Sequence, residues 1–186
     1  MPPKIKVFKE DIVNAAVEIV RKNGESALNT RMIASVLNCS TQPIFSNFSS
    51  MEELRFSVVE YAENLSQKYM DNEVQKNEYP IYKASGMAYI RFAKEEKELF
   101  KLLYMRDRST EDTAVESGIS NKMEWIVRNN TGLGEMEAQL FHLEMWAYVH
   151  GIATMFATGY LDLDWELVSK MLTDCYQGLR KQYGKE

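Results

Sequence analysis

Hydrophobic residues recur every three or four positions along almost the whole chain, the spacing that gives an α-helix one apolar face. The sequence contains neither a credible strand pattern nor an internal repeat. The pattern therefore predicts an all-α protein of about nine helices. The expected helices cover residues 8–22, 30–37, 41–47, 51–74, 80–95, 98–105, 119–129, 135–158 and 164–183.

Residues 29–54 hold the most informative part of this pattern. Two short helical segments are separated by the three-residue break Asn38-Cys39-Ser40, and a third helix begins just after Phe48. This spacing is typical of a helix-turn-helix, which lays its second helix in the major groove of DNA. Ordinary capped helices in a bundle have the same spacing, so the pattern alone leaves that alternative open.

The residues at the ends of these helices favour the helix-turn-helix interpretation. Asn29 and Ser40 are suited to cap the two short helices, and Ser50 followed by Glu53 fits a capping box at the start of the third. Asn38 tolerates the left-handed backbone that a tight turn requires. The apolar residues spaced to bury a small core are Ile12, Ala16, Ile19, Ile33, Leu37, Ile44 and Phe48.

The charge of the chain is unevenly distributed. The net charge is −5, but residues 1–50 carry six basic and four acidic side chains, a net of +2, which leaves −7 on the remainder. DNA affinity depends on local neutralisation of phosphates, so a basic end on an acidic body is compatible with DNA binding. Charge alone would not have indicated DNA.

Other classes of protein find little support in the sequence. No apolar run reaches the roughly 18 residues that span a bilayer, and the N-terminal segment is charged too early for a signal peptide, so we expect a cytoplasmic protein without a membrane partner. Cys39 and Cys175 form no disulfide framework, and His142 and His150 are out of step for a metal site. No nucleophile–base pair, paired carboxylates or Gly-rich phosphate loop indicates an enzyme, and no cofactor is expected.

Residues 8–62 resemble the TetR family of bacterial transcriptional regulators. The resemblance lies in the segments AAVEIVRKNG, TRMIASVLNCS, PIFSNF and SSMEEL, which occur in the family order. It implies a helix-turn-helix DNA-binding domain at residues 1–50 and a helical ligand-binding and dimerisation domain at residues 51–186. Most members of the family are repressors that a small-molecule effector releases from DNA.

Both the exposed face of the second short helix and the resemblance indicate DNA contacts. Gln and Asn side chains can pair with adenine edges, and Pro43 and Phe45 offer apolar contact to thymine methyl groups. Many family members have Lys, Tyr, His and Lys where this chain has Thr41, Phe45, Ser46 and Met51, so we expect an N-terminal arm to contribute and the affinity to be modest. The predicted DNA-binding residues are Lys4, Lys6, Asn29, Thr30, Arg31, Thr41, Gln42, Pro43, Phe45, Ser46, Asn47 and Met51.

Two helices near the C-terminus each have two unlike faces, and one face of each becomes rich in small residues. Small residues let helices approach closely, so these faces are candidates for a homodimer interface, although both could instead face the core of one chain. A twofold dimer also fits a palindromic operator. The segment from Trp146 to Gly151 resembles a Trp-x-x-x-His-Gly signature of one branch of the family. The predicted interface residues are Leu140, Leu143, Ala147, His150, Gly151, Thr154, Leu167, Met171, Asp174 and Gly178.

An effector pocket is expected among the helices between residues 51 and 158. Methionines and aromatic residues suit an adaptable apolar cavity, and they suit an ordinary core equally well. If Glu144 faces such a cavity, a cationic lipophilic ligand is favoured. The predicted lining residues are Met87, Tyr89, Phe92, Phe100, Leu103, Tyr104, Met123, Trp125, Ile126, Phe141, Met145 and Tyr148, and Ile90 shares their pattern.

The leading hypothesis is a dimeric, ligand-responsive regulator, most simply a repressor, which binds a palindromic operator in double-stranded DNA and leaves it when an apolar or amphipathic effector binds. An all-helical protein–protein adaptor without specific DNA binding is the first alternative. A small helical enzyme is the second.

Overall fold

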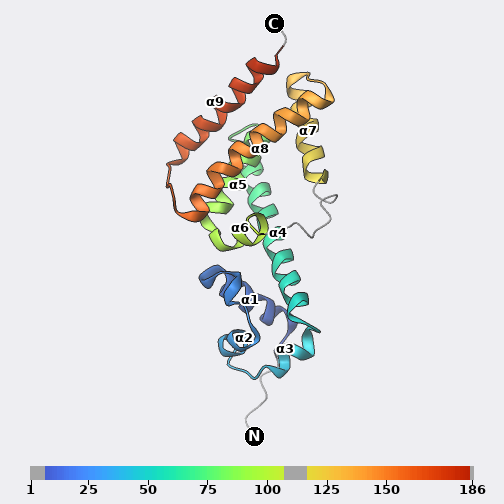
Figure 1. Cartoon of the computed structure of the whole chain (residues 1–186), viewed down its shortest axis with the longest axis vertical. Helices are drawn as coiled ribbons and strands as arrows, with labels where there is room; N and C mark the ends of the chain where they lie inside the picture. Colours follow the sequence, from blue (N-terminus) through green and yellow to red (C-terminus); the bar gives the residue numbers. More distant parts are fainter. Residues whose placement is uncertain (1–6, 107–116, 185–186) are drawn as a thin grey trace. The chain divides into compact units, whose positions relative to one another are not determined.

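The computed structural model describes residues 7–106 and 117–184, the side chains of 117–121 excepted (Figure 1). Its described residues form two compact units: a head unit, which runs to Gln67 and includes Glu96–Arg106, and a C-terminal unit, made of Lys68–Glu95 and residues 117–184. The all-α prediction is confirmed, since these ranges contain helices and no strand. Within them, no helix has both the length and the apolar character that crossing a bilayer requires.

The helices begin and end within a few residues of the positions that hydrophobic periodicity predicts. A three-residue 3₁₀ turn, η1 at Glu25–Ala27, was not predicted because so short an element has no periodicity of its own. The helices are α1 Lys9–Asn23, α2 Thr30–Val36, α3 Gln42–Asn47, α4 Met51–Gln75, α5 Ile81–Glu95, α6 Lys97–Tyr104, α7 Ser117–Thr131, α8 Glu135–Thr158 and α9 Trp165–Tyr183.

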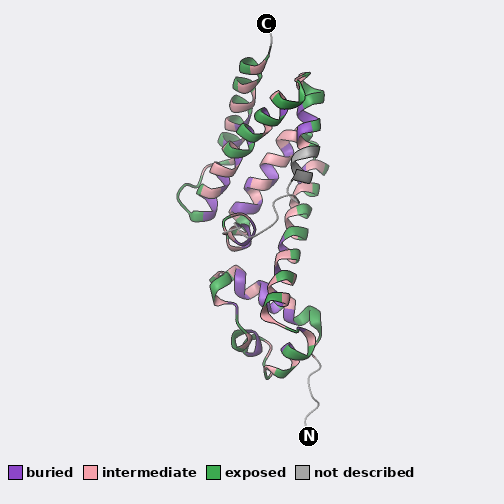
Figure 2. Ribbon diagram, turned by 45° about the vertical axis from the view of Figure 1, so that its right-hand side comes forward, coloured by how far each residue is buried: buried purple, intermediate pink, exposed green. Residues whose placement is uncertain are grey.

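The core of the head unit forms around α1. Apolar residues on α1 alternate with charged ones at helical spacing, and its apolar face is fully buried (Figure 2). Ile33 of α2 and Ile44 of α3 are each at most 1% exposed, and α1 contacts both helices. The predicted small core is therefore confirmed, with only Leu37 left half-buried.

A forked ion pair joins α1 to the residue that precedes α6. The Nε of Arg21 donates to one carboxylate oxygen of Glu96 at 2.8 Å, and an Nη donates to the other at 2.9 Å. Glu18 accepts a further hydrogen bond from the same guanidinium. The guanidinium also lies over the aromatic ring of Tyr61 of α4. Bidentate arginine–carboxylate pairs are among the more geometrically specific contacts in proteins, so α6 is held firmly within the head unit.

The C-terminal unit is built on contact between α5 and α8, with α7 and α9 packed beside them. Gly86 of α5 lies against side chains of both α8 and α9. A Cβ at this position would lie 3.3 Å from the Leu172 side chain of α9 and 3.4 Å from that of Val149 of α8. The absence of a side chain at Gly86 thus allows three helices to meet.

Two tyrosine–histidine pairs also connect α5 to α8. The Tyr82 hydroxyl lies 2.9 Å from Nδ1 of His142, and the Tyr89 hydroxyl lies 2.9 Å from Nδ1 of His150. Burial lowers the pKa of both histidines below the usual value of 6.5, and the carboxylate of Glu124 offsets part of this effect at His142. Both imidazoles are therefore held in the neutral form, in which Nδ1 can accept the phenol proton.

The backbone of Asn38 generates a prediction about stability. Its φ of 50° lies in the left-handed region, where glycine has no steric penalty and most other residues do. We expect Asn38→Ala to lower the free energy of unfolding by about 1 kcal/mol and Asn38→Gly to leave it unchanged or raise it slightly. Urea denaturation of the two variants measures this, with Ser35→Ala on the exposed face of α2 as the control. Equal losses for both Asn38 variants would contradict the explanation.

His142 and His150, both half-buried, predict how stability depends on pH. Because their pKa values are lower in the folded chain, the unfolded chain binds more protons as the pH falls below about 6.5, and the free energy of unfolding decreases. A double variant with Asn at His142 and His150 should show a shallower decrease between about pH 7 and 5.5 in thermal denaturation. Glu53, whose pKa is lowered to about 2, loses its contribution only below about pH 4.5, outside this window. An unchanged slope in the double variant would refute the assignment.

Candidate nucleic-acid interface and effector unit

Helices α2 and α3 are joined by a tight turn at residues 37–41. The Cys39 amide donates to the Ala34 carbonyl at 3.0 Å, and Asn38 adopts the predicted left-handed backbone. At the other end of α2, the Asn29 side-chain oxygen accepts the Met32 amide at 3.0 Å, which confirms Asn29 as the N-cap. These local bonds fix the angle at which α3 leaves the turn.

The prediction that Ser40 caps α3 is wrong. Thr41 holds the N-cap position with a helical backbone, and within the described chain Ser40 is exposed and makes no capping bond. The reason lies in the donors that a cap would satisfy. Pro43 has no N–H group, and the Ile44 amide donates to the Thr41 carbonyl at 3.1 Å. A cap from Ser40 therefore lacks the Pro43 amide, one of the two amides that a capping side chain can accept from.

Helix α3 turns its buried residue Ile44 towards the core and leaves the opposite face open. Phe45 is 60% exposed, and Gln42 and Ser46 are exposed beside it. The Ser46 hydroxyl donates to the Gln42 carbonyl at 2.9 Å, and the amide of half-buried Asn47 donates to the Pro43 carbonyl. Gln42 and Phe45 consequently present the polar and apolar groups with the best access to a ligand.

The remaining predicted DNA contacts of the head unit surround this face unevenly. Arg31 and Asn29 are exposed at the first turn of α2, whereas Thr30, Thr41 and Pro43 are half-buried. Lys4 and Lys6 lie outside the described residues. Lys9 contacts an acid instead, because its ammonium lies 3.2 Å from the Glu53 carboxylate and over the Phe48 ring.

The carboxylate of Glu53, at the start of α4, has different hydrogen-bond partners from those that a capping box predicts. Ser50 caps the Glu53 amide at 3.1 Å as predicted, but the Glu53 carboxylate accepts from the amide and hydroxyl of Ser49 rather than from Ser50. The bonds from Ser49 and the charge of Lys9 lower the pKa of Glu53 to about 2. An ionised carboxylate therefore lies within the same turn as Met51, a predicted phosphate contact that is half-buried.

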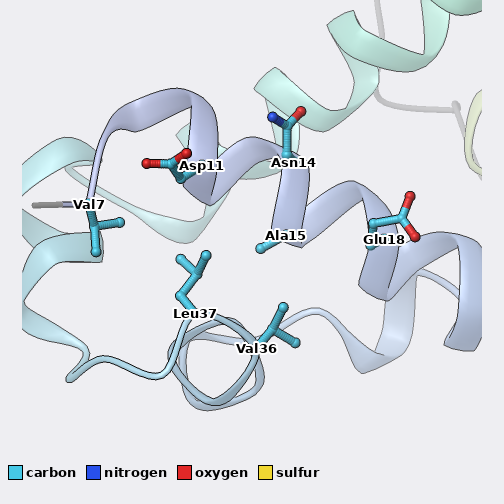
Figure 3. A pocket seen from close by; sticks show the side chains of 7 residues that line it. All are labelled: Val7, Asp11, Asn14, Ala15, Glu18, Val36 and Leu37. Carbon is cyan, nitrogen blue, oxygen red and sulfur yellow. The ribbon is translucent and has the colours of Figure 1, made fainter. Parts of the chain in front are cut away.

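A shallow hollow of about 470 Å³ lies between α1 and the end of α2 in the head unit (Figure 3). Its apolar floor includes Ala15, Val36 and Leu37, and the carboxylates of Asp11 and Glu18 stand at its rim. Carboxylates repel phosphate, so this hollow does not fit a DNA backbone. None of the predicted effector-pocket residues lines it.

The residues predicted to line an effector pocket divide between the two units. Phe100, Leu103 and Tyr104 belong to α6 in the head unit, and the rest belong to α5, α7 and α8 in the C-terminal unit. Trp125 is 64% exposed and lies on the outer side of α7. Those buried in the C-terminal unit are Met87, Phe92, Ile126, Phe141 and Met145, and those half-buried are Tyr89, Met123 and Tyr148.

The predicted division of α8 into two faces agrees with burial in the single chain. Leu143 is 58% exposed, and Leu140 and Ala147 are exposed on the same side, while Phe141, Met145, Val149, Ile152 and Phe156 are buried on the other. On α9, Leu167, Asp174 and Gly178 are exposed and Met171 is half-buried. A Cβ added to Gly151 or Gly178 would meet nothing within 4 Å. His150 and Thr154 are half-buried beside Gly151.

Two side-chain contacts of α8 bear on the predictions made for Trp146 and Glu144. The indole of Trp146 stacks on the His150 ring, with centroids 5.0 Å apart and planes 15° apart, as their one-turn spacing predicts. Glu144 is exposed and accepts the Tyr183 hydroxyl of α9 at 2.9 Å. The condition for a cationic ligand at Glu144, that it should face a cavity, is therefore not met.

Among the described residues, two acids are buried that the sequence patterns did not identify. Glu73 of α4 and Glu124 of α7 are 2% and 8% exposed. The sequence signal for both was weak. Tyr69 and Met70 lie one turn before Glu73, but Val127 is the only apolar residue one turn away from Glu124. Buried acids need partners, so these positions carry chemical information.

Comparison with known proteins supports the assignment of the C-terminal unit. A family model described as a tetracyclin repressor-like C-terminal domain matches residues 82–174, which is half of the chain. No curated protein matches the chain.

Two solved structures are similar over nearly the whole chain. A TetR-like transcriptional regulator from Rhodococcus sp. RHA1 has a TM-score of 0.71 at 13% identity, with 100% of both chains covered. A TetR family transcriptional regulator from Vibrio parahaemolyticus has a TM-score of 0.62 at 13% identity, with 91% of this chain and 96% of that chain covered. At such identities the likeness establishes the shared fold, and together with the family match it shows that this chain belongs to the TetR family of DNA-binding transcriptional regulators, which are not enzymes.

Proposed function

We propose that the protein is a homodimeric, ligand-responsive repressor that binds a palindromic operator. The observation that carries this proposal is the exposed face of α3, where Gln42 and Phe45 stand clear of the core on a helix positioned by a tight turn. A helix of this kind inserts its exposed face into the major groove. Gln42 would read adenine through its amide, and Phe45 would contact a thymine methyl group.

The exposed faces of α8 and α9 form a seam that supports the proposed dimer. This exposed seam consists of Leu140, Leu143 and Ala147 of α8 and Leu167, Asp174 and Gly178 of α9. Exposed leucines beside glycines that have open space above them form a surface suited to close helix packing. A second copy of the chain would cover this surface through a twofold axis, which matches the two half-sites of a palindrome. Large exposed apolar patches on soluble proteins commonly mark such interfaces.

The continuity of α4 supports coupling between effector and DNA. This helix contributes residues as far as Gln67 to the head unit and residues 68–75 to the C-terminal unit. A ligand that prefers one arrangement of the C-terminal unit would shift the population of dimers towards it. If that arrangement separates the heads beyond the spacing of successive major grooves, the protein leaves its operator.

Substitution of Gln42 tests sequence reading. An operator is first selected from random duplexes with the full-length protein. Gln42→Ala should then cost about 1–3 kcal/mol of operator affinity and relax specificity at one base pair in each half-site. Arg31→Ala should instead weaken binding about equally on all sequences, since phosphate contacts carry no base information.

Gln75→Ala, at the exposed end of α4, is the matched control and should bind as the unsubstituted protein does. Uniform weakening by Gln42→Ala would show that Gln42 contacts only phosphate. Failure of the unsubstituted protein to prefer any sequence at low salt would refute the repressor proposal and favour the adaptor alternative.

A charge placed in the exposed seam tests the dimer. Leu143→Glu should convert the protein to a monomer in sedimentation and reduce operator affinity, because a buried unpaired carboxylate is strongly unfavourable at an interface. Phe56→Lys, which removes a still more exposed apolar residue from α4, should leave the oligomeric state unchanged. A Leu143→Glu protein that remains dimeric would place the interface elsewhere.

A further inference from the structure

Lys9, the first residue of α1, lies where the start of α1 meets the end of α3 and the start of α4. Its Nζ is 3.2 Å from Oε1 of Glu53, in the first turn of α4. The same ammonium lies over the ring of Phe48, the residue directly after α3, at 4.7 Å from the ring centroid. The Lys9 side chain is nevertheless 54% exposed. A cation is therefore open to solvent beside the C-terminal end of α3.

The two carboxylate oxygens of Glu53 have different partners. Oε2 accepts the Ser49 amide at 2.7 Å and the Ser49 hydroxyl at 2.8 Å, whereas Oε1 faces the Lys9 ammonium. The bonds from Ser49 are the largest cause of the low pKa of Glu53, about 2, and Lys9 contributes less. Departure of Lys9 would thus leave Glu53 ionised and still bonded to Ser49.

The ion pair between Lys9 and Glu53 is of a kind that dissociates easily. Both side chains are well exposed, and such pairs contribute little to stability because water screens the charges and the long side chains lose freedom. Arg21, by contrast, is 27% exposed and binds the less exposed Glu96 through two parallel hydrogen bonds. Of these two cations on α1, Lys9 is the one that can exchange its partner at little cost.

The position of Lys9 beside α3 indicates which partner it would take. Helix α3 has six residues and is therefore about 9 Å long, while the major groove is about 12 Å wide. Groups beside the ends of such a helix consequently lie near the phosphates that border the groove. A phosphate oxygen is an anionic acceptor, as is the carboxylate oxygen that Lys9 binds in the free protein.

We propose that Lys9 is a DNA-phosphate ligand, which Glu53 binds in the free protein and releases when the DNA backbone approaches. This inference rests on the proposed insertion of α3 into the major groove and adds a phosphate contact to it. Before contact the ion pair is neutral and adds little long-range attraction, because its two charges cancel. Lys9 therefore contributes to the complex itself more than to the encounter.

Substitution of Lys9 tests the phosphate contact. Binding of the full-length protein to its selected operator and to an unrelated duplex of equal length is measured over a range of salt concentrations. Lys9→Gln should weaken binding to both duplexes about fivefold per protomer at about 0.15 M salt, and lower the slope of log K against log salt by about one per protomer. Lys9→Arg keeps the charge and should retain the slope. Lys22→Gln, which removes an exposed lysine from the other end of α1, is the matched control and should also retain it.

Substitution of Glu53 tests the exchange of partners. Glu53→Gln keeps an acceptor oxygen for Ser49 and frees Lys9, so it should strengthen binding to both duplexes about threefold or more per protomer. The gain should be smaller in a protein that already carries Lys9→Gln, because only the repulsion between Glu53 and phosphate is then removed. Glu52→Gln, which removes the neighbouring exposed carboxylate, is the matched control, and its effect should be the same with and without Lys9.

A purely structural role for the ion pair predicts different results. If Lys9 and Glu53 only fix α4 against α1, Glu53→Gln should weaken DNA binding and Lys9→Gln should leave the salt slope unchanged. Either result, in variants that circular dichroism shows to be folded, would overturn the proposal. Equal strengthening by Glu53→Gln with and without Lys9 would overturn it too, since Glu53 would then only repel phosphate.

The outcome for the proposed function is separate. Gln42→Ala should alter operator reading whether or not Lys9 binds phosphate, so an effect of Gln42→Ala without an effect of Lys9→Gln would overturn this inference alone. Absence of an effect from both substitutions would show that α3 does not enter the groove, and would overturn both proposals.

Discussion

The presentation of α3 depends on the burial of one isoleucine. Helices shorter than about 12 residues are marginal in water, and α3 has six, so its own hydrogen bonds cannot maintain it. Contact between Ile44 and the apolar face of α1 maintains it instead. The turn after α2 then sets its direction, and the fork from Arg21 to Glu96 holds α6 against the same helix α1. The exposed face of α3, which carries Gln42 and Phe45, is therefore held in place by tertiary packing.

Much of the positive charge of the head unit is neutralised internally. Lys9 lies against Glu53, and Arg21 against Glu18 and Glu96, so these cations contribute little free charge for phosphate. Recognition of DNA by such a surface must depend more on base edges and shape than on bulk electrostatic attraction, because attraction to phosphate requires unpaired cations.

Sequence patterns located the helices well because long amphipathic periods leave few alternatives. They also identified Asn29 as a cap and Asn38 as the left-handed residue, since both depend on neighbours within a few positions. The prediction that Ser40 is a cap was wrong because Thr41 takes the N-cap position and Pro43 has no N–H group to donate. The Tyr–His pairs could not be predicted, because they depend on which helices meet.

The two Tyr–His bonds restrict how the C-terminal unit can change shape. Tyr82 and Tyr89 are seven residues apart on α5, and their partners His142 and His150 are eight apart on α8, in the same order along the chain. The two helices therefore run in the same direction, with bonds about two turns apart. Sliding α8 along α5 by one turn would break both bonds together and separate two half-buried phenols from their histidine partners. Any rearrangement should accordingly carry α5 and α8 as a single rigid body, with the movement taken up by α7, α9 or the connecting segments.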